Sequence, residues 1–168
     1  MSIYILMLFI FIYSFFGYIY ETAINIVNKV PINSKGFLYG PVRPIYGFGC
    51  AFIIIVFYDT HIDTLPLFFL VGLLACTLEY FTSYLLEKIF NKHYWDYSNN
   101  LFNLNGRVCL LGFTVFGLFG VILVNFIHPN LVELVYDNLS NRSIIYAVYT
   151  LIGIFIIDIL MSLYHLYH

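Results

Sequence analysis

The sequence predicts an all-α protein, a polytopic bundle of about five transmembrane helices that forms a single integral membrane domain over residues 1–168. Three observations support this fold class. Of the 168 residues, 62% are hydrophobic and only 10% are charged, and the mean hydropathy is +0.90. A soluble fold of this length cannot enclose so much apolar surface. The lipid bilayer is therefore the expected solvent of the chain.

Each transmembrane helix needs about 20 largely apolar residues to cross a hydrocarbon core of about 30 Å, and in that core the helix satisfies its own backbone hydrogen bonds. Five apolar stretches are present, at residues 3–27, 44–58, 66–90, 108–127 and 144–164. The first begins almost at Met1, without the basic region or the small-residue cleavage site of a signal peptide. We therefore expect it to be retained as a helix.

Lysine and arginine residues gather in two of the four loops. They are Lys29, Lys35 and Arg43 in the first loop and Lys88, Lys92 and Arg107 in the third. The other two loops carry Arg142 beside Asp59, Asp63, Glu133 and Asp137. The positive-inside rule then places the first and third loops in the cytoplasm, with the N-terminus outside and the C-terminus cytoplasmic. The net charge of -2 predicts no nucleic-acid partner.

Three acidic residues, Glu21, Glu79 and Asp158, lie inside the predicted helices. Counted from the cytoplasmic helix ends at 1.5 Å per residue, all three lie about 10 to 12 Å below the same surface. A carboxylate that faced lipid near the bilayer centre would cost up to about 2.5 to 3.5 kcal/mol, so we expect these side chains to face inward. Small and polar neighbours at helical spacing, such as Ser14 and Gly17 before Glu21, support an inward face.

The first and third loops supply the other polar candidates. Arg43 precedes Pro44, which disfavours helical geometry at Arg43 and predicts that it is held extended at the mouth of the bundle. Arg107 is predicted to open the fourth helix, where its planar fork could bind a carboxylate or phosphate. The predicted polar site comprises Glu21, Arg43, Glu79, Asp96, Asn105 and Arg107, with Asp158, Trp95, Tyr97 and His93 as further candidates.

No metal or cofactor is predicted. His93 has no second histidine at metal-ligand spacing, and the remaining histidines, His61, His128, His165 and His168, are expected to be solvated at helix ends or termini. The three cysteines form no ligand pair either, and we expect them to be small buried apolar residues, at Cys50, Cys76 and Cys109.

An acid-bearing helix, a polar loop and an arginine follow one another twice along the chain. The separation is 22 residues from Glu21 to Arg43 and 28 from Glu79 to Arg107. This order favours a parallel repeat of helices one to two and three to four, and the alternative is coincidence. Two interpretations of the charges also stay open: structural ion pairs that fix helix register, or a site open to the cytoplasm.

Four motifs carry a family resemblance: "YSFFGYIYE" at residues 13–21, "GFLYGPVRPIYGFG" at 36–49, "LEY" at 78–80 and "WDYSNNLFNLNGRVCL" at 95–110. With them the chain resembles the bacterial membrane proteins described as putative ABC-transporter type IV (CmpB-like). The resemblance implies a permease-like protein of the bacterial cell membrane that forms oligomers. It also implies a separate ATPase or second membrane subunit, because the chain has no Walker A loop of its own.

Three functional hypotheses follow. The first is a transport component whose polar site binds a solute or couples to a partner. The second is a membrane enzyme acting on a lipid or isoprenoid, in which Arg43 and Arg107 clamp an anionic head and Glu21, Glu79 or Asp96 is the general acid or base. The third is a structural or assembly partner without a small ligand.

Overall fold

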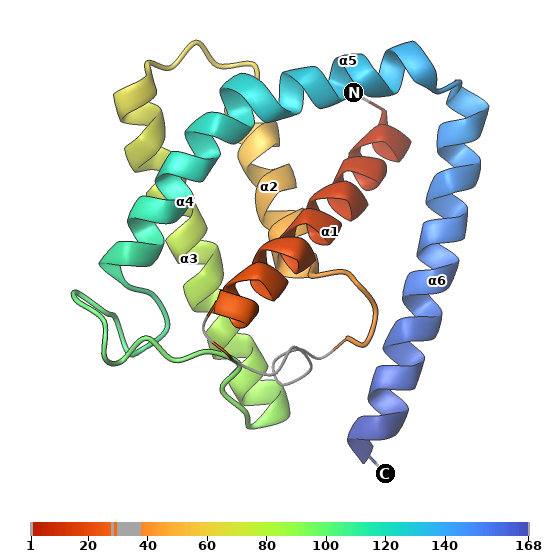
Figure 1. Ribbon diagram of the computed structural model, residues 1–168. Coiled ribbons are helices and arrows are strands. Elements are labelled where there is room, and N and C mark those ends of the chain that lie inside the picture. The colour runs from red at the N-terminus through yellow and green to blue at the C-terminus, as the bar shows by residue number, and fades with distance from the viewer. Residues whose placement is uncertain (1, 28, 30–37, 168) are drawn as a thin grey trace. The chain divides into compact units, whose positions relative to one another are not determined.

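The computed structural model describes residues 2–27, 29 and 38–167, and within these ranges every regular element is helical (Figure 1). The elements are α1 (Ile3–Val27), α2 (Pro44–Phe57), α3 (Thr64–Phe90), α4 (Leu110–Ile122), the π-helical turn η1 (Leu123–Ile127), α5 (His128–Asn138) and α6 (Asn141–Tyr167). Because α4, η1 and α5 follow one another without a break, the described residues form five helical runs. The predicted all-α class is confirmed. Lys35 and Gly36 of the first loop lie outside the described residues.

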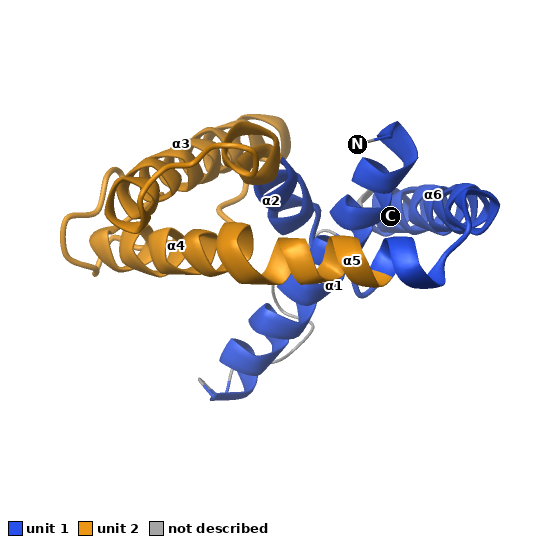
Figure 2. Ribbon diagram, turned by 90° about the horizontal axis from the view of Figure 1, so that it is seen from above, with its two compact units in different colours: residues 1–51, 135–168 blue, residues 52–134 orange. Residues whose placement is uncertain are grey.

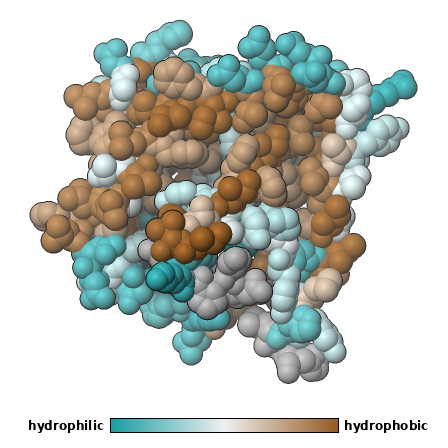
Figure 3. All heavy atoms as spheres, in the orientation of Figure 1, coloured by the Kyte–Doolittle hydropathy of each residue, from teal (hydrophilic) through white to brown (hydrophobic). Residues whose placement is uncertain are grey.

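Four of these runs are long and apolar enough to cross a membrane: α1, α3, the run Leu110–Asn138 and α6. Helix α2 has 14 residues, which corresponds to about 21 Å, less than the hydrocarbon thickness of about 30 Å. Hydrophobic side chains cover most of the helix surfaces visible in Figure 3. Many large apolar side chains are exposed, among them Leu73, Ile89 and Ile157. This surface is that of an integral membrane protein.

Local capping sets where the helices begin and end. Helix α3 begins two residues before Pro66, because proline is tolerated in the first turn of a helix. It ends where Asn91 adopts the left-handed conformation, with φ of 51°, and donates its backbone N–H to Glu87 O. Helix α6 begins three residues before the predicted start, because Ser140 Oγ accepts the backbone N–H of Ser143 at 3.2 Å and caps the helix.

The fourth run begins two residues later and ends eleven residues later than the hydropathy predicts. Val108 forms an isolated bridge with Leu104, so the helix begins at Leu110. Beyond it, Pro129 lacks an N–H and would interrupt an α-helix, but η1 directly precedes this position and widens the turn, with the N–H of His128 donating to Leu123 O. The helix therefore continues, and Glu133 and Asp137, which were expected in a loop, lie on α5.

His128 is buried, which corrects the prediction of a solvated residue at a helix end. Its side chain is fully enclosed, and its ring lies edge-on against the ring of Tyr58, with the centroids 4.6 Å apart. The prediction was wrong because the helix does not end at Ile127, so His128 lies within a longer helical run.

The chain divides into two compact units (Figure 2). Unit 1 comprises residues 1–51 and 135–168. In it, the beginning of α2 lies so close to α1 that a Cβ atom at Gly47 would be 2.0 Å from Ser14 Oγ. Helix α6 lies along α1 and runs parallel to it. The ring centres of Tyr4 and Tyr149 are 6.2 Å apart, and those of Phe11 and Phe155 are 5.9 Å apart.

Unit 2 comprises residues 52–134 and is built on the antiparallel pair α3 and α4. Glycine lets these helices approach closely: a Cβ atom at Gly120 would lie 2.1 Å from Val71 Cγ1, and one at Gly117 would lie 2.8 Å from the backbone oxygen of Phe68. Small residues at such contacts allow the extensive packing that holds helices together in lipid. The single membrane domain predicted for residues 1–168 stays a prediction.

We expect Gly120→Ala to destabilise the protein by about 1 to 3 kcal/mol, because Val71 is fully buried and cannot move away from the added methyl group. Gly153 is the matched control, since a Cβ atom there meets nothing within 4 Å. Gly153→Ala should be neutral or stabilise α6 by up to about 1 kcal/mol. Steric-trapping measurements of unfolding in bicelles compare the two variants, and equal effects would contradict the packing described.

Candidate functional site

The segment before α2 is held by a carboxylate of α6, within unit 1. Asp158 Oδ1 accepts the backbone N–H groups of Tyr39 at 3.1 Å and Gly40 at 3.0 Å, and Oδ2 accepts the N–H of Gly40 at 3.1 Å. A Cβ atom at Gly40 would lie 2.8 Å from Oδ2, so glycine is needed for this close approach. Asp158 therefore serves here as an acceptor for backbone groups of the first loop.

Arg43 follows this segment and is bound on several sides. Its Nε donates to Glu21 Oε2 at 2.6 Å, and its guanidinium lies 5.2 Å from the centre of the Tyr18 ring. Its backbone N–H donates to Ser14 O at 2.9 Å. The next residue, Pro44, is the first residue of α2, a position where its missing N–H costs nothing. The ion pair therefore fixes the point at which α2 begins against α1.

Arg107 forms the corresponding ion pair in unit 2. Its partner is Glu87 and not Glu79, the acid that precedes it in the predicted repeat. Its Nη2 donates to Glu87 Oε2, and its Nη1 donates to Ser83 Oγ at 3.2 Å. The guanidinium also lies 5.7 Å and 5.6 Å from the ring centres of Tyr80 and Tyr84. The hydrogen bond to Glu87 raises the pKa of Arg107 above its ordinary value. Arg107 precedes the first residue of α4 by three positions rather than opening the helix itself.

Glu79 belongs to neither arginine pair. Its side chain is buried, with an exposed fraction of 7%, and Oε1 accepts the hydroxyl of Tyr97 at 3.1 Å. Oε2 has no hydrogen-bond partner among the described residues. It faces the beginning of α4, since a Cβ atom at Gly112 would lie 3.9 Å from it. A carboxylate oxygen is thus enclosed inside unit 2 with unused capacity to accept a hydrogen bond.

The loop at residues 91–109 is folded by its own polar side chains. Asp96 Oδ1 accepts the backbone N–H of Ser98 at 2.9 Å and its hydroxyl at 2.5 Å, and both bonds lower the pKa of Asp96 below its ordinary value. Gly106 has φ of +67°, and a Cβ atom there would lie 2.6 Å from both Asp96 Oδ1 and Ser98 Oγ. Trp95 Nε1 donates to the carbonyl of Arg107 at 3.1 Å, and Asn105 Nδ2 donates to Tyr80 Oη at 2.8 Å.

The predicted site residues therefore fall into two groups, one in each unit. The unit 1 group holds Glu21, Arg43 and Asp158, and the unit 2 group holds Glu79, His93, Trp95, Asp96, Tyr97, Asn105 and Arg107. The predicted convergence of all of them on one face stays a prediction. Within each group the arginine is bound by a carboxylate, through Nε in Arg43 and through Nη2 in Arg107.

Glu87 is the residue that sequence reasoning missed. It binds Arg107 and also lies 3.4 Å from His93 Nε2. A signal for it was present, because Glu79, Ser83 and Glu87 recur every four residues and so share one face of α3. Its position near the end of the helix gave it the appearance of an ordinary solvated residue.

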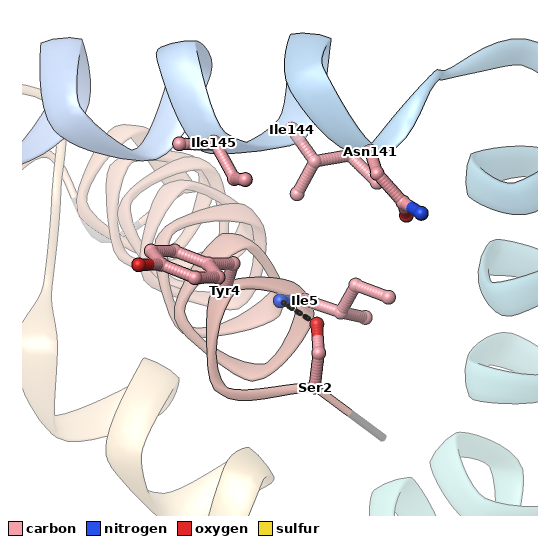
Figure 4. Close-up of a pocket in the computed structure, with 6 residues that line it drawn as sticks. All are labelled: Ser2, Tyr4, Ile5, Asn141, Ile144 and Ile145. Carbon is pink, nitrogen blue, oxygen red and sulfur yellow. Dashed lines mark hydrogen bonds between the residues drawn. The ribbon is translucent and has the colours of Figure 1, made fainter.

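Two pockets in unit 1 are lined by other residues. The first, of about 250 Å³, lies where the beginning of α1 faces the beginning of α6 (Figure 4), and it is lined by Ser2, Tyr4, Ile5, Asn141, Ile144 and Ile145. The backbone N–H of Ile5 donates to Ser2 Oγ at 3.4 Å at its edge. The second, of about 220 Å³, is lined mainly by apolar side chains of α1, α2 and α6. Neither contains a charged residue, so neither is the predicted polar site.

Among the described residues, no group of three histidine, cysteine, aspartate or glutamate side chains could hold a metal ion. The cysteines are free thiols, with Cys50 and Cys109 buried and Cys76 half-buried. Cys109 has a local structural contact, because its Sγ accepts the backbone N–H of Gly112 at 3.4 Å at the start of α4.

A double-mutant cycle tests which glutamate Arg107 uses. We expect Glu87→Gln to destabilise the protein, because it removes the carboxylate that binds Arg107. The coupling energy with Arg107→Gln should be large for Glu87 and near zero for Glu79. Exposed Glu133 provides the control for loss of a carboxylate charge. Equal coupling of Arg107 to both glutamates, measured by steric trapping, would contradict the assignment.

Searches of curated proteins and of solved structures give no match. A family model described as "Putative ABC-transporter type IV" matches residues 8–163, which includes the last helix with Asp158 as well as both arginines. The match extends over most of the chain, so the protein belongs to the putative ABC-transporter type IV family.

Proposed function

We propose that this protein is a membrane subunit of a transporter, and that Glu79 is the group that receives a polar part of the solute. The observation that carries the proposal is the buried carboxylate of Glu79, which lies in a candidate transmembrane helix with Oε2 unbonded within the described residues. Ionisable residues inside transmembrane helices are costly, and they often mark the path of a substrate or ion. A hydrogen-bond donor or cationic group is the chemistry that Oε2 would accept.

The two ion pairs support a different role for the arginines. Glu21 and Glu87 occupy the guanidinium groups of Arg43 and Arg107, and aromatic rings cover them. Paired in this way, they stabilise the loops that connect apolar helices. The carboxylate partner of each guanidinium already balances its charge and weakens its attraction for a second anion. The geometry therefore favours the transport hypothesis over an anion-clamping lipid enzyme.

A transporter of this kind needs an energy source and further membrane surface. The sequence has no Walker A loop, so ATP hydrolysis would come from a separate subunit. Five helical runs are few for a permease, and many large apolar side chains are exposed. We therefore propose that the chain associates with a second copy or a second membrane subunit as well as with an ATPase.

We also propose that the first and third loops face the cytoplasm of a bacterial cell, with the N-terminus outside. The lysine and arginine distribution supports this orientation. It requires α2 to cross the membrane despite its 14 residues, because otherwise Arg43 and Arg107 would lie on opposite sides. A short helix can cross where the bilayer thins locally or where flanking residues reach to the interface.

The transport proposal is tested by purifying the tagged protein in native-membrane nanodiscs. We expect an ATPase subunit to co-purify and Glu79→Gln to lower the ATP hydrolysis rate of the complex about tenfold, equivalent to about 1.4 kcal/mol. Glu133→Gln, an exposed change on α5, should leave the rate unchanged. Repeated purification without an ATPase or second membrane subunit would contradict the proposal. The enzyme hypothesis would be favoured if deletion of the gene altered the cellular lipid profile and a gene copy carrying Arg107→Ala failed to restore it.

The orientation is tested by labelling single cysteines with a membrane-impermeant maleimide. The background carries Cys50→Ala, Cys76→Ala and Cys109→Ser, the last retaining an acceptor for the N–H of Gly112. His61→Cys should react in intact cells, and Asn99→Cys should react only after permeabilisation. The reverse pattern, with Asn99→Cys reacting in intact cells and His61→Cys only after permeabilisation, would contradict the orientation. It is the pattern expected if the N-terminus is outside and α2 does not cross the membrane.

A further inference from the structure

The loop at residues 91–109 is held together by polar side chains and exposes large apolar side chains at its tip. Asn103 Nδ2 donates to the carbonyls of Ser98 at 3.1 Å and Asn100 at 3.0 Å, and Asn103 Oδ1 accepts the N–H of Gly106 at 3.2 Å. Three large apolar side chains at its tip are exposed among polar ones such as Asn99, with exposed fractions of 78% for Leu101, 84% for Phe102 and 58% for Leu104. Bulky apolar side chains gathered on an exposed turn are suited to apolar or interfacial surroundings.

The backbone holds Phe102 in this outward position. Phe102 has φ of 51°, a left-handed conformation that is unusual for a bulky residue and unfavourable in energy. The Asn103 bonds on its C-terminal side stabilise the turn that contains it. The exposure of the aromatic ring is thus built into the folded loop.

The tip is continuous with a surface that faces lipid. The carbonyl of Leu101 accepts the N–H of Leu110 at 3.2 Å, and Leu110 is the first residue of the candidate span Leu110–Asn138. The exposed fractions of Leu110 and Leu111 are 46% and 65%. The tip therefore lies beside one end of a segment that is long and apolar enough to cross the membrane.

The lysines at the end of α3, where this loop begins, match an anionic lipid surface. Lys88 and Lys92 are exposed, with their ammonium groups 5.7 Å and 5.6 Å from the ring centres of Tyr84 and Tyr94. The negative charge of Glu87 is balanced by its ion pair with Arg107. Lysines beside aromatic rings and exposed apolar side chains are the combination that binds the interface of anionic membranes.

We propose that the tip formed by Leu101, Phe102 and Leu104 inserts into the interface of an anionic phospholipid bilayer beside the beginning of α4. It is a monotopic anchor within a polytopic protein. It fixes the depth and tilt of α3 and α4 relative to the membrane surface. The folded loop is hydrogen-bonded to α3 through Asn105 and Arg107, and to the first residue of α4 through the carbonyl of Leu101.

Spin labelling of the full-length protein tests the proposal in vesicles of phosphatidylethanolamine and phosphatidylglycerol. Nitroxides are placed at Phe102→Cys and at Asn99→Cys, an exposed polar position in the same loop, in the cysteine-replaced background. Collisions with oxygen should exceed those with a water-soluble nickel chelate several-fold at position 102, with the reverse at position 99. Preference for the nickel chelate at both positions would overturn the proposal, and so would spin–spin broadening at position 102, which would indicate a second copy there.

A second measurement avoids the cysteine replacements. Phe102→Trp adds a fluorophore to the native Trp95, and lipids brominated near the headgroup should quench this added emission more strongly than the emission of the unaltered protein. Emission at position 102 that is no more quenched than that of Trp95 would overturn the proposal.

Discussion

Two arginine side chains must be neutralised where the chain turns from a polar loop into an apolar helix. Arg43 directly precedes α2 and is bound by Glu21, and Arg107 lies three residues before α4 and is bound by Glu87. A guanidinium so near hydrocarbon is tolerated only with a charged or hydrogen-bonding partner. Because each partner belongs to the preceding long helix, each ion pair also fixes where the next helix begins.

Most of the remaining polar contacts complete these two loops. Asp158 accepts N–H groups of the first loop, and the indole of Trp95 donates to the carbonyl of Arg107 in the third. Backbone groups that are not in a helix need such partners wherever packing withdraws them from water. Glu79 differs from these residues, since it is more deeply buried and one of its oxygens is unbonded within the described chain. This contrast separates the residue proposed to bind a solute from those that support the loops.

Much of the fold could be predicted because bilayer thickness and hydrophobicity restrict it. The bounds 3–27 were confirmed for α1, and the other helix beginnings differ from prediction by at most three residues. The largest difference lies at residues 128–138, where a histidine and a proline suggested a loop. The π-helical turn η1 accommodates Pro129, and hydropathy carries no information about hydrogen bonds that extend five residues back.

The candidate site could be predicted only in part. Helical periodicity placed Glu79 and Ser83 on a buried face of α3, as the structure has them. The partner of Arg107 could not be predicted, since Glu79 and Glu87 share that face and lie about 12 Å apart along the helix. The choice between them depends on the left-handed turn at Asn105 and Gly106, which directs the guanidinium toward Glu87.

The sequence by itself determined the all-α membrane fold, the approximate helix positions and the residue types beside the membrane, because these follow from the cost of placing polar groups in hydrocarbon. Only the tertiary structure decided the ion-pair partners, the burial of His128 and the outward position of Phe102. Those features depend on loop conformation and on contacts between residues far apart in the chain, and hydrophobic periodicity encodes neither.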